Sequence, residues 1–258
     1  MTHEEQNSIR EGVEKVFANV KEAAIRSGRN PEDIRIVLAT KTQSAEKINF
    51  AASCGIKEIG ENRVQELLEK YDSLDKEKLK IHFIGTLQSN KVKYIIDKVC
   101  LIHSVNSKKL AAEIDRQAKK HGIIMDILVE LNAVSEESKT GVDENELYEL
   151  INYISTLENV RVKGLMAIPP APQNVNICEI CSLIEGANVN NLQINDVSRH
   201  YFRKILKIFL DISAKKMDNI NMDILSLGMS GDYIEAIEEG SNLIRPGRAV
   251  FGERPKIV

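Results

Sequence analysis

The sequence predicts an α/β fold: a single closed (β/α)₈ barrel, of the TIM type, preceded by an extra N-terminal helix. Eight short apolar segments alternate with stretches of helical spacing, and parallel strands require such crossover helices between them. The runner-up, an open doubly wound sheet, is disfavoured because no Gly-x-Gly-x-x-Gly follows the first strand. No proline-rich or glycine-rich linker divides the chain, so residues 1–258 are expected to form one domain.

Each element follows from its local pattern. Apolar residues at Val13, Val16, Val20 and Ala24 have helical spacing, and Gly28 ends this first helix. The predicted strands are Ile34–Thr40, Glu58–Glu61, Lys80–Gly85, Leu101–Val105, Asp126–Asn132, Val162–Ile168, Asp223–Ser230 and Asn242–Phe251. The predicted helices are Ala45–Cys54, Arg63–Tyr71, Ser89–Asp97, Ser107–Lys120, Glu144–Leu157, Ser198–Lys215 and Tyr233–Glu239.

Composition excludes several functional classes. Among 258 residues, 43% are hydrophobic and the net charge is −3, which gives no support to a nucleic-acid surface. No apolar run is long enough to span a membrane, and the polar start Met1–Arg10 does not resemble a secretory signal. A cytoplasmic protein is expected. No strongly apolar surface helix indicates an obligate dimer, so a monomer is expected.

The four cysteines do not indicate a disulfide framework or a metal site. Cys178 and Cys181 form a C-x-x-C, but no second Cys or His pair follows at zinc-like spacing, so no metal is predicted. They lie in the polar stretch 171–195, which is predicted to be a loop after the sixth strand.

Lys41 directly follows the first predicted strand. Because a buried strand tolerates no unpaired charge, this lysine is expected at the strand's C-terminal mouth, where (β/α)₈ barrels place their chemistry. An amine held there and partly desolvated can attack a carbonyl group and form a Schiff base. The alternative is a lysine whose ammonium group simply reaches water past the strand end.

The last two strand ends predict a phosphate site. The seventh predicted strand ends in small residues, which include Gly228 and Ser230. Asp232 follows it, and Asp232 with Glu235 resembles a capping box of the next helix. The run Arg245–Arg248 again combines cations with a glycine at a strand mouth. Barrels of this type bind phosphate in the loops after strands seven and eight. The alternative is that the glycines serve only as turn residues.

Longer motifs resemble a known family, the pyridoxal 5′-phosphate (PLP) homeostasis proteins, single-domain relatives of the alanine racemase barrel of fold type III. The matching segments run in order along most of the chain: 38–42 (LATKT), 60–66 (GENRVQE), 82–91 (HFIGTLQSNK), 139–142 (KTGV), 164–166 (GLM), 225–232 (LSLGMSGD) and 245–252 (RPGRAVFG).

The resemblance implies a role for each matching residue. Lys41 would hold PLP as a Schiff base, and Ser230 with the backbone around Gly247 and Arg248 would bind its phosphate. Arg245 would face the pyridine nitrogen. The remaining two residues implied to lie close to the cofactor are Asn62 and Met166.

The function implied is intracellular PLP homeostasis: storage, buffering or delivery of the cofactor, with apo PLP-dependent enzymes as candidate recipients and without robust turnover. A cation at the pyridine nitrogen opposes its protonation and makes the ring a poorer electron sink. Only Glu253–Val258 follow the last predicted strand, so no second domain is expected to supply an opposed catalytic group. The alternatives are a PLP-dependent amino-acid racemase or lyase, with Tyr201, His82 or Glu61 as acid or base, and a phosphate-substrate barrel without PLP.

Overall fold

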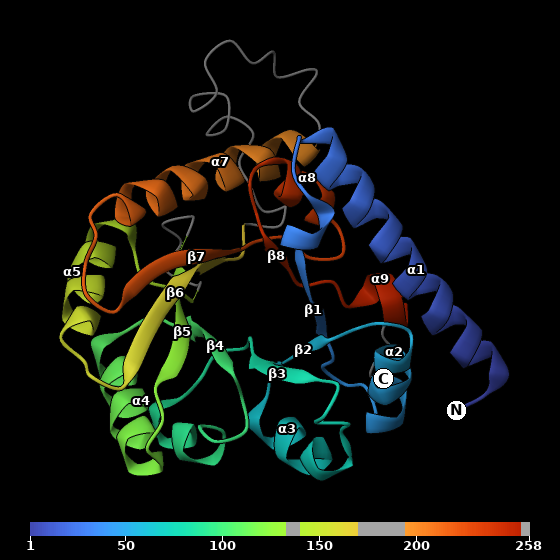
Figure 1. Cartoon of the computed structure of the whole chain (residues 1–258), viewed down its shortest axis with the longest axis horizontal. Helices are drawn as coiled ribbons and strands as arrows, with labels where there is room; N and C mark the ends of the chain where they lie inside the picture. The colour runs from blue at the N-terminus through green and yellow to red at the C-terminus, as the bar shows by residue number, and fades with distance from the viewer. Residues whose placement is uncertain (133–139, 170–193, 254–258) are drawn as a thin grey trace.

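The structure is a computed structural model that describes residues 1–132, 140–169 and 194–253. Within them, eight parallel strands close into a barrel in chain order, with β8 pairing back to β1 (Figure 1). The predicted loop 171–195 lies almost wholly outside the described residues, as do Cys178 and Cys181. The strands are β1 (Arg35–Ala39), β2 (Glu58–Glu61), β3 (Lys80–Phe83), β4 (Leu101–Val105), β5 (Met125–Leu131), β6 (Val160–Ala167), β7 (Ile220–Ser226) and β8 (Leu243–Ile244).

Helices surround this barrel, and the predicted N-terminal helix is confirmed (Figure 1). It begins at a capping box in which Thr2 and Glu5 bond each other's backbone amides. Although first in sequence, it lies alongside the last two helices, α8 and α9, across the outside of the barrel. The helices are α1 (His3–Arg26), α2 (Ala45–Ser53), α3 (Val64–Lys70), α4 (Lys108–His121), α5 (Glu144–Ser155), α7 (Ile194–Ser213), α8 (Tyr233–Glu238) and α9 (Arg248–Phe251), with 3₁₀ turns η1 (Pro31–Asp33), η2 (Tyr71–Ser73) and η3 (Ser89–Tyr94).

Two apolar clusters divide the interior. The larger one lies between the strands and the surrounding helices. The smaller one fills the barrel itself, from Val37 and Leu101 to Leu128, Met166 and Leu243. The barrel interior is therefore a packed core rather than a channel, and ligands must approach from its ends.

The eighth strand is much shorter than predicted. It comprises only Leu243–Ile244, and the second half of the predicted strand forms α9. Pro246 has no N–H to continue the ladder. Its carbonyl oxygen instead accepts from the amide of Ala39, at 2.7 Å, and the chain then turns into the short helix. The seventh strand likewise ends at Ser226, before the left-handed Gly228 (φ +90°).

The predicted capping box at α8 is wrong. Asp232 precedes the helix but makes no side-chain cap, because its Oδ1 accepts from the backbone amide of Met229, at 2.7 Å. This bond closes the turn that contains Ser230. Helix α8 is therefore held by other contacts.

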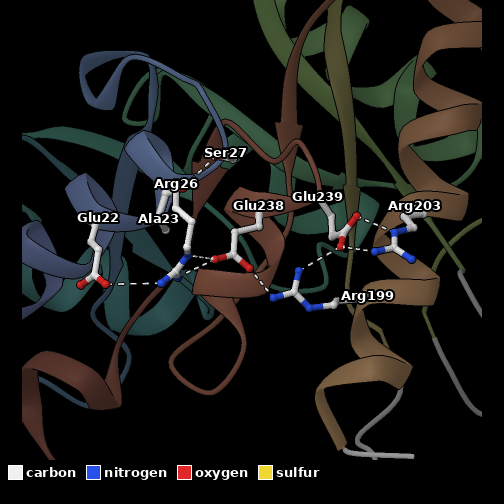
Figure 2. A network of polar contacts seen from close by, with 8 residues as sticks. All are labelled: Glu22, Ala23, Arg26, Ser27, Arg199, Arg203, Glu238 and Glu239. Carbon is white, nitrogen blue, oxygen red and sulfur yellow. Dashed lines mark hydrogen bonds and ion pairs between the residues drawn. The ribbon is translucent and has the colours of Figure 1, made fainter.

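Ion pairs connect α8 to its two neighbouring helices (Figure 2). Glu238 pairs with Arg26 of α1 and with Arg199 of α7. Glu239 accepts from Arg199 at 2.9 Å and from Arg203 at 2.7 Å. Both glutamates are largely buried, and the cations hold their pKa values below the ordinary range against the opposing effect of burial. The network fixes α8, which follows the loop that contains Ser230.

Candidate functional site

Lys41 lies in a tight turn at the C-terminal end of β1. The amide of Gln43 donates to the carbonyl oxygen of Thr40, and Thr42 adopts a left-handed conformation (φ +66°). The ammonium group of Lys70, on α3, donates to the carbonyl oxygens of Thr40 and Gln43 at 3.2 and 3.1 Å. The half-buried Lys41 is therefore carried on a backbone segment that is held at both ends.

A buried carboxylate supports this turn from the neighbouring strand. Glu61 ends β2 and is fully buried, and its Oε1 accepts from the hydroxyl of Thr40 and lies 2.8 Å from Nζ of Lys70. Burial raises the pKa of Glu61, while Lys70 and Thr40 oppose the shift. Glu61 therefore joins the ends of β1 and β2 to helix α3, which positions the turn that carries Lys41.

The loops after β7 and β8 form a turn with features of an anion site. The hydroxyl oxygen of Ser230 accepts from the amides of Gly247 and Ala249, at 2.9 and 3.2 Å. Since both of these bonds use its lone pairs, its own proton remains to be donated to a ligand. A Cβ at Gly247 would lie 3.0 Å from the carbonyl oxygen of Ala39, so the close approach of the two loops favours glycine there.

Arg245 follows β8 and is buried beneath this turn, with 4% of its surface exposed. Its Nη1 donates to the backbone oxygen and the hydroxyl of Ser226, at 2.7 and 2.5 Å, and Nη2 donates to the carbonyl oxygen of Ala167 at 3.1 Å. Burial lowers its pKa to about 10, and Asp232 and Glu130 oppose the shift. The guanidinium therefore stays charged at neutral pH.

A second buried carboxyl group lies at the same end of the barrel. Glu130, on β5, accepts from the hydroxyl of Thr140 at 2.6 Å, whereas its Oε2 is buried with no hydrogen-bond partner in the described parts of the chain. Burial raises its pKa, and the charge of Arg245 counteracts this shift. It is in register with Met166 on β6, which is 1% exposed. Asn62, after β2, also has a buried side-chain oxygen without a partner among these residues.

The structure places most of the predicted site residues at one end of the barrel. The pairing of β1 with β8 brings the loop of Gly247 to the end of the strand that precedes Lys41. Met166 precedes Ala167, whose carbonyl oxygen Arg245 contacts. Unlike the other predicted site residues, Arg248 has a largely exposed side chain, which lies 3.5 Å from Glu253. Only the backbone of Arg248 is therefore close to the predicted phosphate turn.

Sequence reasoning overlooked three residues of this region: Glu130, Ser226 and His103. Glu130 and His103 each interrupt an apolar strand with a polar side chain, and this signal in the sequence could have identified both. Ser226 lies at the end of the motif 225–232, but it was not distinguished from its neighbours there. No group of three His, Cys, Asp or Glu side chains within residues 1–132, 140–169 and 194–253 could hold a metal ion.

Comparisons with known proteins agree with this fold. The sequence model of the family described as alanine racemase, N-terminal domain, matches residues 13–255. The structure is similar to PipY of Synechococcus elongatus solved with PLP bound, at 27% identity and a TM-score of 0.70, over 91% of this chain and all of that one. It is also similar to a protein of unknown function from Bifidobacterium adolescentis, at 30% identity and a TM-score of 0.84, over 97% of both chains.

The fold and the site thus define a protein of the alanine racemase N-terminal barrel class. A relative from Aquifex aeolicus is called pyridoxal phosphate homeostasis protein; it is 41% identical over 244 residues, which is 95% of this chain and 97% of that protein. The chain therefore belongs to the pyridoxal phosphate homeostasis protein family. None of the helices within the described residues is long and apolar enough to cross a membrane.

Proposed function

We propose that this protein binds PLP through Lys41 and acts in intracellular PLP homeostasis by storing, buffering or delivering the cofactor. One observation carries the proposal: the lysine turn after β1 and the serine–glycine turn after β7 and β8 are joined, by the 2.7 Å bond from Ala39 to Pro246. An amine and an anion site are thereby held side by side at one barrel mouth. The PLP-bound PipY structure and the names of the homologues support the same function.

The residues at this mouth fit PLP chemically. The free proton of the Ser230 hydroxyl suits a phosphate group, and the backbone of Gly247 and Arg248 lies beside it because the amides of Gly247 and Ala249 donate to that hydroxyl. The buried cation of Arg245 suits an unprotonated ring nitrogen, because a positive charge opposes a second one. The buried oxygens of Glu130 and Asn62, which lack partners, can accept from a ligand.

Lys41 would hold PLP, whose aldehyde would supply the carbonyl group for a reversible covalent link to the lysine amine, with one water molecule released. The chain's own residues prepare this step. Lys70 and Glu61 hold the turn that carries Lys41, and Arg245 holds a positive charge that keeps the ring a poor electron sink. Such a site favours reversible retention of the aldehyde over carbanion chemistry.

The racemase or lyase alternative needs an acid–base group near Lys41, and the candidates weighed from sequence are poorly suited. Burial lowers the pKa of His82 to about 3, and its ring lies inside the barrel. Glu61 is engaged by Thr40 and Lys70. Tyr201 is buried on α7. Exchange of the α-proton of amino acids into solvent, measured with the PLP-loaded protein, tests this alternative directly; detectable exchange would support it.

Borohydride reduction followed by peptide mass spectrometry tests the cofactor and its attachment together. We expect a reduced PLP adduct on Lys41 in the wild-type protein and none in Lys41→Ala. The matched control is Lys91→Ala, an exposed lysine on η3 at the same end of the barrel, which should keep the adduct on Lys41. An adduct of equal yield in Lys41→Ala, after removal of loosely bound PLP, would contradict the proposal.

The proposal has further parts. We propose that residues 1–258 act as one cofactor-binding domain, that the protein works as a monomer in the cytoplasm, and that apo PLP-dependent enzymes receive its cofactor. Transfer is measured by mixing the PLP-loaded protein with such an apoenzyme and following the recovery of its activity. Recovery no faster than spontaneous release of PLP from the carrier would argue against direct delivery.

A further inference from the structure

A chain of polar side chains crosses the interior of the barrel, from the end that carries Lys41 and Ser230 towards the opposite end. Nη1 of Arg245 lies 2.5 Å from the hydroxyl of Ser226, which lies 3.2 Å from Nδ1 of His103. Nε2 of His103 lies 2.9 Å from Nδ1 of His82. Nε2 of His82 lies 3.5 Å from a carboxylate oxygen of Glu58. We call these five residues the interior chain.

The end at Arg245 fixes the direction of the hydrogen bonds. A guanidinium group only donates, so the Ser226 oxygen accepts from it. The hydroxyl has a single proton, and Nδ1 of His103 is the other polar atom within hydrogen-bond distance of it. Ser226 therefore donates to His103, whose Nδ1 must carry a lone pair. Since a neutral imidazole has one N–H, His103 is then protonated at Nε2.

The contact at Glu58 favours the same direction by charge alone, because Nε2 of His82 makes no hydrogen bond within the described residues. If His103 donates from Nε2, His82 accepts at Nδ1 and carries its proton on Nε2, which faces the Glu58 carboxylate. The reverse direction would place a lone pair of His82 against that carboxylate. It would also leave the Ser226 proton without an acceptor.

Burial keeps both rings neutral, and the surrounding positive charges act in the same direction. His82 and His103 are fully buried, and Arg35, Lys80 and Arg245 add positive charge around them. Burial is the largest cause of the lowered pKa of each ring, which is about 3 for His82. Glu58 is the anion nearest to the pair, and its carboxylate is shared with Arg35 at 2.9 Å.

We propose that His103 and His82 are positioning residues that hold the Arg245 guanidinium against the cofactor ring. His103 takes the only proton of the Ser226 hydroxyl, so the lone pairs of this hydroxyl face Arg245. Without that acceptor the hydroxyl rotates and its proton competes with the guanidinium. The proposal rests on the proposed function, because Arg245 is assigned there to the ring nitrogen.

The tautomers of the two rings test the interior chain without any cofactor. Long-range ¹H–¹⁵N spectra of the cofactor-free protein, labelled at histidine nitrogens and assigned with His82→Gln and His103→Gln, distinguish the two neutral forms. We expect both buried rings to carry the proton on Nε2 at pH 7. A proton on Nδ1 of His103, or a doubly protonated ring, would overturn the proposal.

Release of PLP tests what the interior chain does. We expect His103→Leu to release PLP about tenfold faster than wild type and to shift the visible absorption of the bound cofactor. Ser226→Ala should act similarly, and the double variant should be little worse than either single variant, because both changes break one chain. His121→Gln, an exposed histidine at the end of α4, is the control and should match wild type.

The two proposals fail in different ways. A wild-type protein without a borohydride-fixed adduct would refute the proposed function, whereas the tautomer measurement would still decide the interior chain. An adduct that forms normally, with release rate and spectrum unchanged in His103→Leu and Ser226→Ala, would refute the positioning role alone. If His103→Leu does not fold, His103→Gln replaces it, and strictly additive effects of His103→Gln and Ser226→Ala would also count against the chain.

Discussion

The two buried histidines make the stability of the fold depend on pH, with a definite sign. His82 has its pKa lowered to about 3 by burial, and that of His103 is lowered well below 6.5 for the same reason. In the unfolded chain both rings bind a proton near pH 6.5. Unfolding below that pH therefore takes up protons. The contribution of the two neutral rings to the free energy of unfolding is fully present above pH 6.5. It is lost as the pH falls towards the pKa values of the rings in the folded state.

The size of the effect follows from proton linkage. Between pH 6.0 and 5.0, one histidine that stays neutral in the folded state lowers the free energy of unfolding by about 1.2 kcal/mol, so the pair lowers it by about 2.4 kcal/mol. Glu61 and Glu130 act with the opposite sign, because burial raises their pKa values and the folded state binds protons first as the pH falls. A comparison of variants at equal pH cancels their contribution.

Urea unfolding at several pH values between 7.5 and 5.0 measures this linkage. Between pH 6.0 and 5.0, we expect the free energy of unfolding to fall by about 2.4 kcal/mol less in the double variant His82→Gln/His103→Gln than in wild type. This difference does not depend on the stability of the variant at pH 7.5. His121→Gln, which removes an exposed histidine, is the control and should follow the wild-type curve. Parallel curves for wild type and the double variant would refute the reasoning that the buried rings are neutral.

Two further predictions concern packing and surface charge. Gly164→Ala should lower the free energy of unfolding by more than about 4 kcal/mol, or prevent folding, because its Cβ would lie 1.8 Å from the carbonyl oxygen of Ile224 on the adjacent strand. Gly122→Ala, which meets open space at a left-handed φ of +65°, should cost only about 1–2 kcal/mol in the same urea assay. Glu239→Ala should cost about 1.5–3 kcal/mol, because it removes the acceptor of two arginines (Figure 2). Glu22→Ala, at the exposed end of that network, should change stability by less than about 0.5 kcal/mol; equal losses for Glu239→Ala and Glu22→Ala would contradict this ranking.

The sequence was sufficient for the order and type of the elements, because strand and helix patterns differ in period and depend on neighbours close in sequence. The short strand β8 could not be anticipated. The apolar segments 243–244 and 249–251 flank the run Arg245–Arg248 and are predicted as parts of one strand, yet the strand ends at Ile244. The end is set by Pro246 and by the position of Ala39 in β1, a contact between residues about two hundred positions apart.

The same limit applies to the site. Lys41, Ser230 and Arg245 were found because each lies at a strand end, where a barrel gathers its functional groups. The contact between His82 and His103 depends on the register of β3 with β4, in which His82 is paired with Leu101. The contact between His103 on β4 and Ser226 on β7 depends on closure of the barrel. A shift of one residue would turn either ring towards the helices. No local pattern in the sequence specifies that register.

Some buried polar atoms of the barrel have hydrogen-bond partners and others have none, and this difference bears on where a ligand would bind. A buried polar group without a partner costs free energy, so a fold retains one only where another interaction offsets the cost. Within the described residues, Arg245 is bonded to three acceptors on the strands. Five buried side-chain atoms there have no hydrogen-bond partner: His82 Nε2 and Ser104 Oγ on β3 and β4, and three oxygens at the C-terminal ends of strands, Glu130 Oε2, Glu61 Oε2 and Asn62 Oδ1. A ligand that donates to these oxygens relieves that cost. The three partnerless oxygens at the mouth therefore support the proposed PLP site, and the buried guanidinium of Arg245 supplies a positive charge at the same end of the barrel.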